Sequence, residues 1–360
     1  MRVCIISEAR SYHTQRWTKS LAQAGCEVHL ISTYEADIPG VVLHRLPIYA
    51  QNPLKQVINN TRVKRLIRKL QPDIVHLFGL FSVSSLGSML IVRDLKNLVI
   101  SLWGSDVVPA DRDETFKEGL IKRYLLNKGD SLIATSHYLA REAKTYLKRP
   151  HRIINVIPWG VDLETFSFID RNRKENTITV GFAKRLHKLA GPDVLLKAFH
   201  YARNKCKKKI VLKVAGDGPM ISELKQQAVQ LGIADCVEWV GWLKTDKEVS
   251  DFCGTLDLFV MPSRREAFGL SAVEALATGL PVIASRFGGI PEIVIHEETG
   301  LLVEPEDVEG FGEAIVTLAD NRDLALTMGI NGRKRVEALF DWNSSVNQMI
   351  RIYQEVKRVQ

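Results

Sequence analysis

Short apolar runs alternate with amphipathic helical patterns along almost the whole chain, and this alternation restricts the fold more than any other feature. The runs are rich in β-branched residues, as in RVCIIS, EVHLIST and DIVHLF near the start. They are apolar nearly throughout, which is typical of strands that are buried on both faces. Strands that alternate with helices predict an α/β fold built on parallel, doubly wound sheets.

The length of the chain and one polar interruption predict two such domains. A single core rarely serves as many as 360 residues. The stretch RNRKENT at 171–177 has no apolar periodicity and is typical of a linker. We therefore expect Rossmann-like domains over 1–165 and 171–340, facing each other across a cleft. A helical pattern over 341–360 either packs back toward the first domain or ends the second as a surface helix.

The composition is that of a compact soluble protein. Hydrophobic residues make up 46% and charged residues 25%, without a low-complexity run. No apolar stretch reaches the roughly 18 residues of a membrane span, and Met1 leads directly into a strand-like run. The five scattered cysteines form no CxxC motif, which favours buried thiols in a reducing compartment over zinc ligands. We expect a cytoplasmic protein.

Positive charge is concentrated in the first half of the chain. Residues 1–165 contain 23 Lys and Arg against 15 Asp and Glu, while residues 166–360 contain 26 of each, so the excess of +8 lies in the first half. Much of it falls on a helical pattern at 52–73. This pattern predicts either attraction to an anionic membrane face or phosphate-bearing acceptor, or a solvated helix face. Its cations are Lys55, Arg62, Lys64, Arg65, Arg68 and Lys69.

The stretch at 261–294, MPSRREAFGLSAVEALATGLPVIASRFGGIPEIV, carries the most chemical information. It predicts a strand, a loop, a helix, a second strand and a second loop. Glu266 precedes the helix and Glu274 lies eight residues later, roughly 80° beyond two helical turns, so both can address one elongated ligand. Backbone amides between them, at a helix N-terminus, favour a phosphate. By itself the pair also fits ordinary surface charges on a helix.

The wider sequence resembles the family 4 retaining glycosyltransferases, also called glycosyl transferases group 1. Its hallmark, Glu-x7-Glu, is matched by EAFGLSAVE within EAFGLSAVEALATGLPVIAS, and GGIPEIV and ETGLLVEPED follow. Further matches are VGFAKRL, VAGDGP, VEWVGW, PDIVH, GSDVV, SLIATSHYLA and VIPWGVDLETF, in the family's order, so the resemblance covers nearly the entire chain. It implies the GT-B fold.

The resemblance also implies roles for particular residues of the second domain. Glu266 matches the glutamate that contacts the donor sugar, and Glu274 matches the one that holds the nucleotide ribose. The diphosphate-binding turn and the adjoining glycine-containing loop match further donor-binding positions: Phe268, Gly269, Leu270, Ser271 and Gly216. Arg185 matches the arginine that neutralises the departing diphosphate. The family's lysine is replaced by Ala190, and we favour Lys188 as the second cation over a missing role.

The first domain departs from the family's usual pattern. Trp103 stands where many members have a histidine, so that we expect it to shape an acceptor or sugar surface, or else to be buried at a strand end. Asp106 either bonds an acceptor hydroxyl as a catalytic residue or caps a helix. His13 and His76 follow predicted strands and are candidate ligand contacts, with structural histidines as the alternative.

Together these features predict an enzyme that transfers a sugar from a nucleoside diphosphate sugar to a hydroxyl of a glycan, lipid-linked or other acceptor. We expect retained anomeric configuration, a role in cell-surface polysaccharide or glycolipid synthesis, and peripheral contact with an anionic membrane. We expect no cofactor, no metal and no nucleic-acid partner. The DxD pair of Asp111 and Asp113 has the spacing used by metal-dependent glycosyltransferases of another fold, but it lacks a matching context here. The alternative is a nucleotide-sugar-binding subunit without catalysis, motivated by Ala190 and Trp103.

Overall fold

The computed structural model describes the chain except residues 48–52, 81–88, 90, 109–113, 172–176 and 359–360 and the side chains of 53–59. Contacts divide the chain into two compact units. The first unit contains Met1–Pro158 and Ser344–Gln360, and the second contains Trp159–Asn343. Within the described residues no helix has both the length and the apolar character needed to cross a bilayer.

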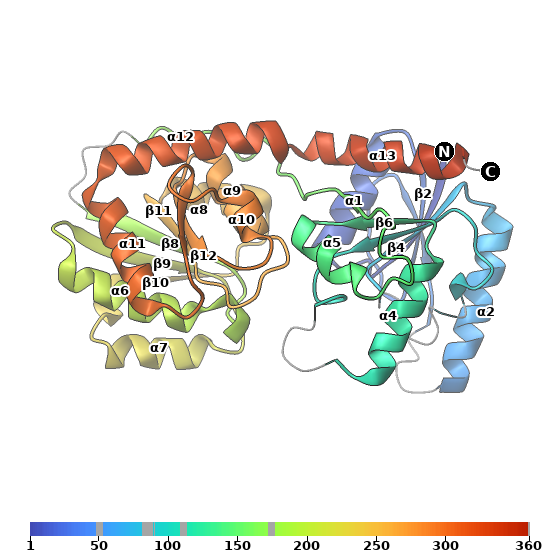
Figure 1. Cartoon of the computed structure of the whole chain (residues 1–360), viewed down its shortest axis with the longest axis horizontal. Helices are drawn as coiled ribbons and strands as arrows, with labels where there is room; N and C mark the ends of the chain where they lie inside the picture. The colour runs from blue at the N-terminus through green and yellow to red at the C-terminus, as the bar shows by residue number, and fades with distance from the viewer. Residues whose placement is uncertain (48–52, 81–88, 90, 109–113, 172–176, 359–360) are drawn as a thin grey trace. The chain divides into compact units, whose positions relative to one another are not determined.

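The first unit is built on a parallel sheet, in which β2, β4 and β6 are labelled in Figure 1. Its strand order is β3-β2-β1-β4-β5-β6-β7. The order reverses between β1 and β4, as in doubly wound folds, and ligands in such folds bind beyond the carboxyl ends of the strands. The strands are β1 (Arg2–Ile6), β2 (Glu27–Ser32), β3 (Val41–Arg45), β4 (Ile74–Phe78), β5 (Leu98–Leu102), β6 (Ser131–Ala134) and β7 (Asn155–Val156). The helices include α1 (Tyr12–Gln23), α2 (Pro53–Leu70), α4 (Phe116–Lys128), α5 (His137–Lys144) and α13 (Trp342–Arg358).

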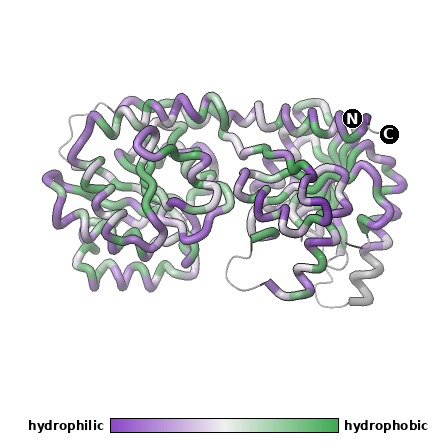
Figure 2. Tube along the Cα trace, viewed as in Figure 1, coloured by the Kyte–Doolittle hydropathy of each residue, from purple (hydrophilic) through white to green (hydrophobic). Residues whose placement is uncertain are grey.

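Burial explains the apolar runs of this sheet. Every residue of β4 and β5 is buried, so neither strand alternates between apolar and polar positions. Helix α1 buries Thr14, Trp17, Thr18 and Leu21, a helical stripe that packs on the sheet while its other face stays polar. Figure 2 shows the same separation, with hydrophobic strands inside and hydrophilic positions along the outer helices.

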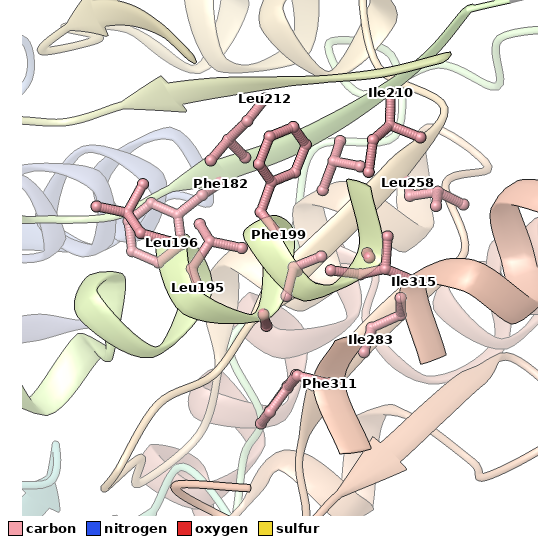
Figure 3. Close-up of a cluster of buried hydrophobic side chains, with 14 of the residues drawn as sticks. Phe182, Leu195, Leu196, Phe199, Ile210, Leu212, Leu258, Ile283, Phe311 and Ile315 are labelled. Carbon is pink, nitrogen blue, oxygen red and sulfur yellow. The ribbon is translucent and has the colours of Figure 1, made fainter. Parts of the chain in front are cut away.

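The second unit repeats the plan with the parallel order β10-β9-β8-β11-β12-β13. Its core lies between the sheet and helices such as α6, and includes Phe182, Phe199, Leu212 and Phe311 (Figure 3). The strands are β8 (Thr177–Ala183), β9 (Lys209–Ala215), β10 (Val237–Gly241), β11 (Leu258–Met261), β12 (Val282–Ser285) and β13 (Gly300–Val303). The helices are η1 (Lys188–Ala190), α6 (Pro192–Lys205), α7 (Ile221–Gln230), η2 (Ala234–Cys236), α8 (Asp246–Gly254), α9 (Leu270–Ala277), α10 (Ile290–Ile293), α11 (Val308–Asp320) and α12 (Arg322–Leu339).

The boundary between the units differs from the linker expected at 171–177. The chain enters the second unit at Trp159, and Val161 exchanges backbone hydrogen bonds with Phe340 (2.9 Å) and Trp342 (3.0 Å). The side chain of Arg171 is buried and donates to backbone carbonyls of the second unit, among them that of Leu256 at 3.0 Å. The polar character of the stretch at 171–177 predicted a linker. In the structure the polar group of Arg171 instead binds these carbonyls inside the second unit. Residues 172–176 lie outside the described part.

Candidate functional site

The Glu-x7-Glu stretch forms the loop between β11 and α9 and the helix itself. Gly269 is the N-cap of α9 and has φ 113°, a left-handed conformation that side chains rarely adopt. A Cβ there would meet the methyl of Met261 at 3.3 Å. The turn thus aims the first amides of α9, those of Leu270 and Ser271, out of the helix start, where intrahelical acceptors are lacking. The hydroxyl of Ser271 lies 3.2 Å from the sulfur of Met261.

Glu266 is held by a lysine from the neighbouring strand end. Lys184 follows β8, and its Nζ pairs with the Glu266 carboxylate and donates to Ser263 Oγ at 3.1 Å. Strands β8 and β11 are adjacent in the sheet, so both residues lie at its carboxyl edge. Lys184 was not among the site residues predicted from the sequence. The sequence feature that could have identified Lys184 is its position directly after an apolar strand, one residue before Arg185.

Gly216 serves a close backbone approach. It follows β9 with φ 135°, and a Cβ there would lie 2.0 Å from the carbonyl oxygen of Lys184. Its amide donates to Gly241 O at 2.7 Å. The two strand-end loops therefore pack directly on each other, which fixes the course of the chain through Lys184. The contact between Gly216 and the donor stays a prediction.

Arg185 and Lys188 lie exposed in the loop after β8, and neither side chain has an ion pair among the described residues. Arg264 holds this loop. Its guanidinium forms two bonds of 2.7 Å with the Asp193 carboxylate, pairs with Glu306 and donates to the Lys188 carbonyl at 2.6 Å. Burial by itself would raise the pKa of Asp193, but the hydrogen bonds and the positive charge of Arg264, with smaller contributions from a backbone hydrogen bond and Lys197, together lower the pKa overall.

Glu274 and Phe268 lie deeper in the second unit. Glu274 is half-buried on α9 near Cys253; burial raises the pKa of that thiol to about 12, and the charge of Glu274 adds to the effect. The Phe268 ring is buried in edge contacts with Trp159 and Phe340, at centroid distances of 6.4 and 6.1 Å. Only its backbone can therefore contribute to the predicted diphosphate turn.

His76 is a structural residue of the first unit, which is at odds with the predicted ligand contact. The imidazole is fully buried on β4. Its Nδ1 bonds the Tyr353 hydroxyl at 2.5 Å and its Nε2 bonds Ser101 Oγ at 2.8 Å. Burial lowers the pKa of His76 to about 3. Both ring nitrogens are occupied, so none is left for a substrate.

Asp106 organises the loop after β5. Its buried carboxylate accepts the amides of Gly104 at 2.8 Å, Trp103 at 3.1 Å and Leu80 at 3.3 Å. Burial raises the pKa of Asp106, while these three hydrogen bonds oppose the rise. The carboxylate joins the loops that follow β4 and β5. This role differs from both predictions for Asp106, which were a bond to an acceptor hydroxyl and a helix cap.

His13 and Trp103 come together beyond the carboxyl ends of β1 and β5. Their rings meet edge to face with centroids 6.0 Å apart, and Trp103 also lies 5.2 Å from the Phe78 ring. Both side chains are half-buried. Burial lowers the pKa of His13 to about 4, and the charge of Arg16 adds to this effect. The pair forms an apolar wall with a neutral imidazole at this edge of the sheet.

No cluster of three or more His, Cys, Asp or Glu side chains in the described residues is arranged to hold a metal ion. Asp111 and Asp113 lie outside these residues.

Comparison with known families and proteins covers both units. Residues 164–335 match the family described as "Glycosyl transferases group 1", and residues 2–136 match "Glycosyl transferase 4-like". The chain is 26% identical over 359 residues to the N-acetyl-alpha-D-glucosaminyl L-malate synthase of Bacillus anthracis, across 94% of this chain and 92% of that protein. It is 33% identical over 210 residues to a GDP-mannose-dependent alpha-(1-6)-phosphatidylinositol monomannoside mannosyltransferase of Mycobacterium tuberculosis, across 54% of each.

Solved structures share the fold at lower identity. Sucrose-phosphate synthase from Thermosynechococcus elongatus matches with a TM-score of 0.84 and 22% identity, over 100% of both chains. HepE of Anabaena, in complex with UDP and glucose, matches with a TM-score of 0.80 and 18% identity, over 98% of this chain and 99% of that one. The parallel, doubly wound sheets expected from the alternating runs are thereby confirmed, as is the GT-B fold.

Proposed function

This chain is a glycosyltransferase of the group 1 family, and on that premise we propose that it moves a sugar from a nucleoside diphosphate sugar to an acceptor hydroxyl with retention of configuration. The observation that carries the proposal is the β11–α9 turn: Glu266 in the loop before the helix, left-handed Gly269 at its start and Glu274 about one turn into it. Carboxylates on both sides of free helix amides suit a sugar, a diphosphate and a ribose in sequence.

The barrier to this reaction is charge separation between an oxocarbenium-like sugar and a departing diphosphate. In the proposed mechanism the amides of Leu270 and Ser271 and the guanidinium of Arg185 stabilise the diphosphate. Glu266 faces the donor sugar and Glu274 accepts hydrogen bonds from the ribose hydroxyls. The acceptor oxygen bonds the anomeric carbon on the face that the diphosphate leaves, and the acceptor proton passes to a diphosphate oxygen. This route uses neither metal nor cofactor.

We further propose that the acceptor carries negative charge, as in cell-surface polysaccharide or glycolipid synthesis at the cytoplasmic membrane face. Relatives are named for acting with L-malate, D-inositol 3-phosphate and a phosphatidylinositol mannoside, which are all anionic. Among the described side chains of α2, the exposed cations are Arg62, Arg65, Arg68 and Lys69. A positive surface attracts anionic lipids and acceptors alike.

Donor binding is tested by thermal unfolding of the whole chain with UDP, GDP and ADP sugars. A ligand at 100 times its dissociation constant adds about 2.7 kcal/mol of stability, so one nucleotide class is expected to raise Tm clearly. Glu274→Ala removes the ribose acceptor and is expected to abolish the shift. Glu309→Ala, an exposed carboxylate on α11, is the control. If none of the three classes of nucleotide sugar raises Tm, the proposal that the donor binds at this turn is wrong.

A further inference from the structure

The pairing of Lys184 with Glu266 bears on the second cation of the donor site. The two side chains are only 17% and 20% exposed, and Ser263, which accepts a hydrogen bond from the same ammonium, is buried. A charge removed this far from water needs polar partners, and here the ammonium has two, Glu266 and Ser263. The Lys188 side chain, by contrast, is exposed and has no ion pair in the described part of the chain.

The ammonium of Lys184 has capacity for a further partner. An ammonium carries three donors, and within the described residues two of them are used, for Glu266 and Ser263. Its backbone is fixed by the bond from its amide to Ala215 O at 3.2 Å and by the close approach of Gly216. The lysine is therefore held at the carboxyl edge of the sheet, where ligands of such folds bind.

The positive charge of Lys184 changes how Glu266 affects the proposed reaction. A lone Glu266 carboxylate beside the donor would repel the diphosphate as its negative charge grows. Pairing with a lysine cancels that repulsion and keeps the carboxylate oriented. The lysine usual in the family is replaced by Ala190, which is buried in the core and contributes no charge.

We propose that Lys184, rather than Lys188, is the second cation of the donor site: it orients Glu266 and gives its remaining N–H to an oxygen of the donor diphosphate. This inference rests on the proposed function. It revises the preference for Lys188 that the sequence alone suggested. It also assigns the pair Lys184 and Arg185 to one strand end, so that the charge neutralising the leaving group comes from adjacent residues.

The test measures the affinity of the full chain for nucleoside diphosphates and monophosphates by calorimetry, with UDP and UMP, GDP and GMP, and ADP and AMP as probes. For the diphosphate that binds wild type, Lys184→Met is expected to lose about tenfold in affinity, with at most a twofold loss for the monophosphate. Lys184→Arg restores most of the loss, because it keeps the charge. Lys225→Met, an exposed lysine on α7, controls for net charge.

The outcomes separate this inference from the proposed function. If Lys188→Met loses the diphosphate affinity while Lys184→Met binds like wild type, Lys188 is the second cation and the inference is overturned although donor binding stands. Equal losses for diphosphate and monophosphate in a Lys184→Met protein that arginine does not rescue would show a structural role and overturn it as well. Failure of wild type to bind any of the three diphosphates instead refutes the proposed function.

Discussion

The imidazole of His76 and the phenol of Tyr353 are 277 positions apart in the chain and meet at 2.5 Å inside the first unit. The bond attaches α13 to β4, and a second attachment is the ion pair of 2.8 Å between Lys357 on the same helix and Asp73 just before β4. The C-terminal helix thus belongs to the unit that contains the N-terminus. Its attachment depends on a histidine that stays neutral.

The first prediction is that His76 makes stability depend on pH. Burial lowers the pKa of His76 from 6.5 to about 3, so the unfolded chain takes up the proton first as pH falls. Its contribution is complete above pH 6.5 and is lost toward pH 3, at up to about 1.4 kcal/mol per pH unit. Denaturant unfolding between pH 7 and about 4.5 measures this slope, and His76→Asn is expected to lower it by about that amount.

His151→Asn, at an exposed histidine, is the matched control and is expected to keep the wild-type slope. His13, whose pKa burial lowers to about 4, contributes a slope of its own that remains in both variants. An unchanged slope in His76→Asn would show that the buried imidazole does not titrate between the folded and unfolded states as its placement requires.

The family resemblance, together with residue spacing, predicted the Glu-x7-Glu turn but not the partners of its charges. Glu266 and Glu274 lie on one continuous loop and helix, so local geometry was sufficient to relate them. Lys184 and Lys188 are both close to Arg185 in the sequence, and what separates them is the packing of the chain against Gly216. That contact joins two distant loops, and no local pattern encodes it.

The same limit explains why the sequence left two interpretations of His76 open. It lies on a strand beside a predicted binding edge, and a histidine there fits a ligand contact or a core position equally well. The hydrogen bond between His76 and Tyr353, near the other end of the chain, distinguishes the two, and no local pattern predicts it. The helical pattern at 341–360 was visible, but its apolar stripe does not say which sheet it covers.

The second prediction concerns Arg264, which holds the loop of Arg185 and Lys188. Arg264→Met leaves Asp193 half-buried without its bidentate partner, and we expect a loss of roughly 1–3 kcal/mol in the free energy of unfolding. Arg264→Lys is expected to recover less than half, because an ammonium cannot form both bonds. Thermal and denaturant unfolding measure the loss.

The matched control for Arg264 is Arg203→Met, which breaks an exposed pair with Asp235 at 3.4 Å and is expected to cost at most about 1 kcal/mol. The affinity for the nucleoside diphosphate should fall in Arg264→Met and not in Arg203→Met. Equal effects of the two substitutions would mean that Arg264 acts as an ordinary surface charge.

The third prediction is that α2 attracts anionic membranes. Replacing Arg62, Arg65, Arg68 and Lys69 by Gln removes about 1 kcal/mol of attraction per cation near the surface, so binding to phosphatidylglycerol vesicles should fall at least tenfold. Co-sedimentation at low and high salt measures it. The control replaces four exposed lysines of the second unit by Gln: Lys207, Lys209, Lys225 and Lys244. An equal loss of vesicle binding in both variants would show that binding depends on net charge and not on α2.

The last prediction assigns Trp103 to the acceptor. Its ring is half-buried and contacts the rings of His13 and Phe78, which places an aromatic surface at the strand ends of the first unit. Aromatic packing of this kind is worth roughly 0.5–1.5 kcal/mol, so Trp103→Ala is expected to raise the KM for acceptor about three- to tenfold. Because the nucleotide turn lies in the second unit, the affinity for the nucleoside diphosphate should not change. Trp242→Ala, at an exposed tryptophan after β10, is expected to alter neither quantity. A fall in nucleotide affinity without a change in the KM for acceptor would contradict the assignment and place Trp103 with the donor.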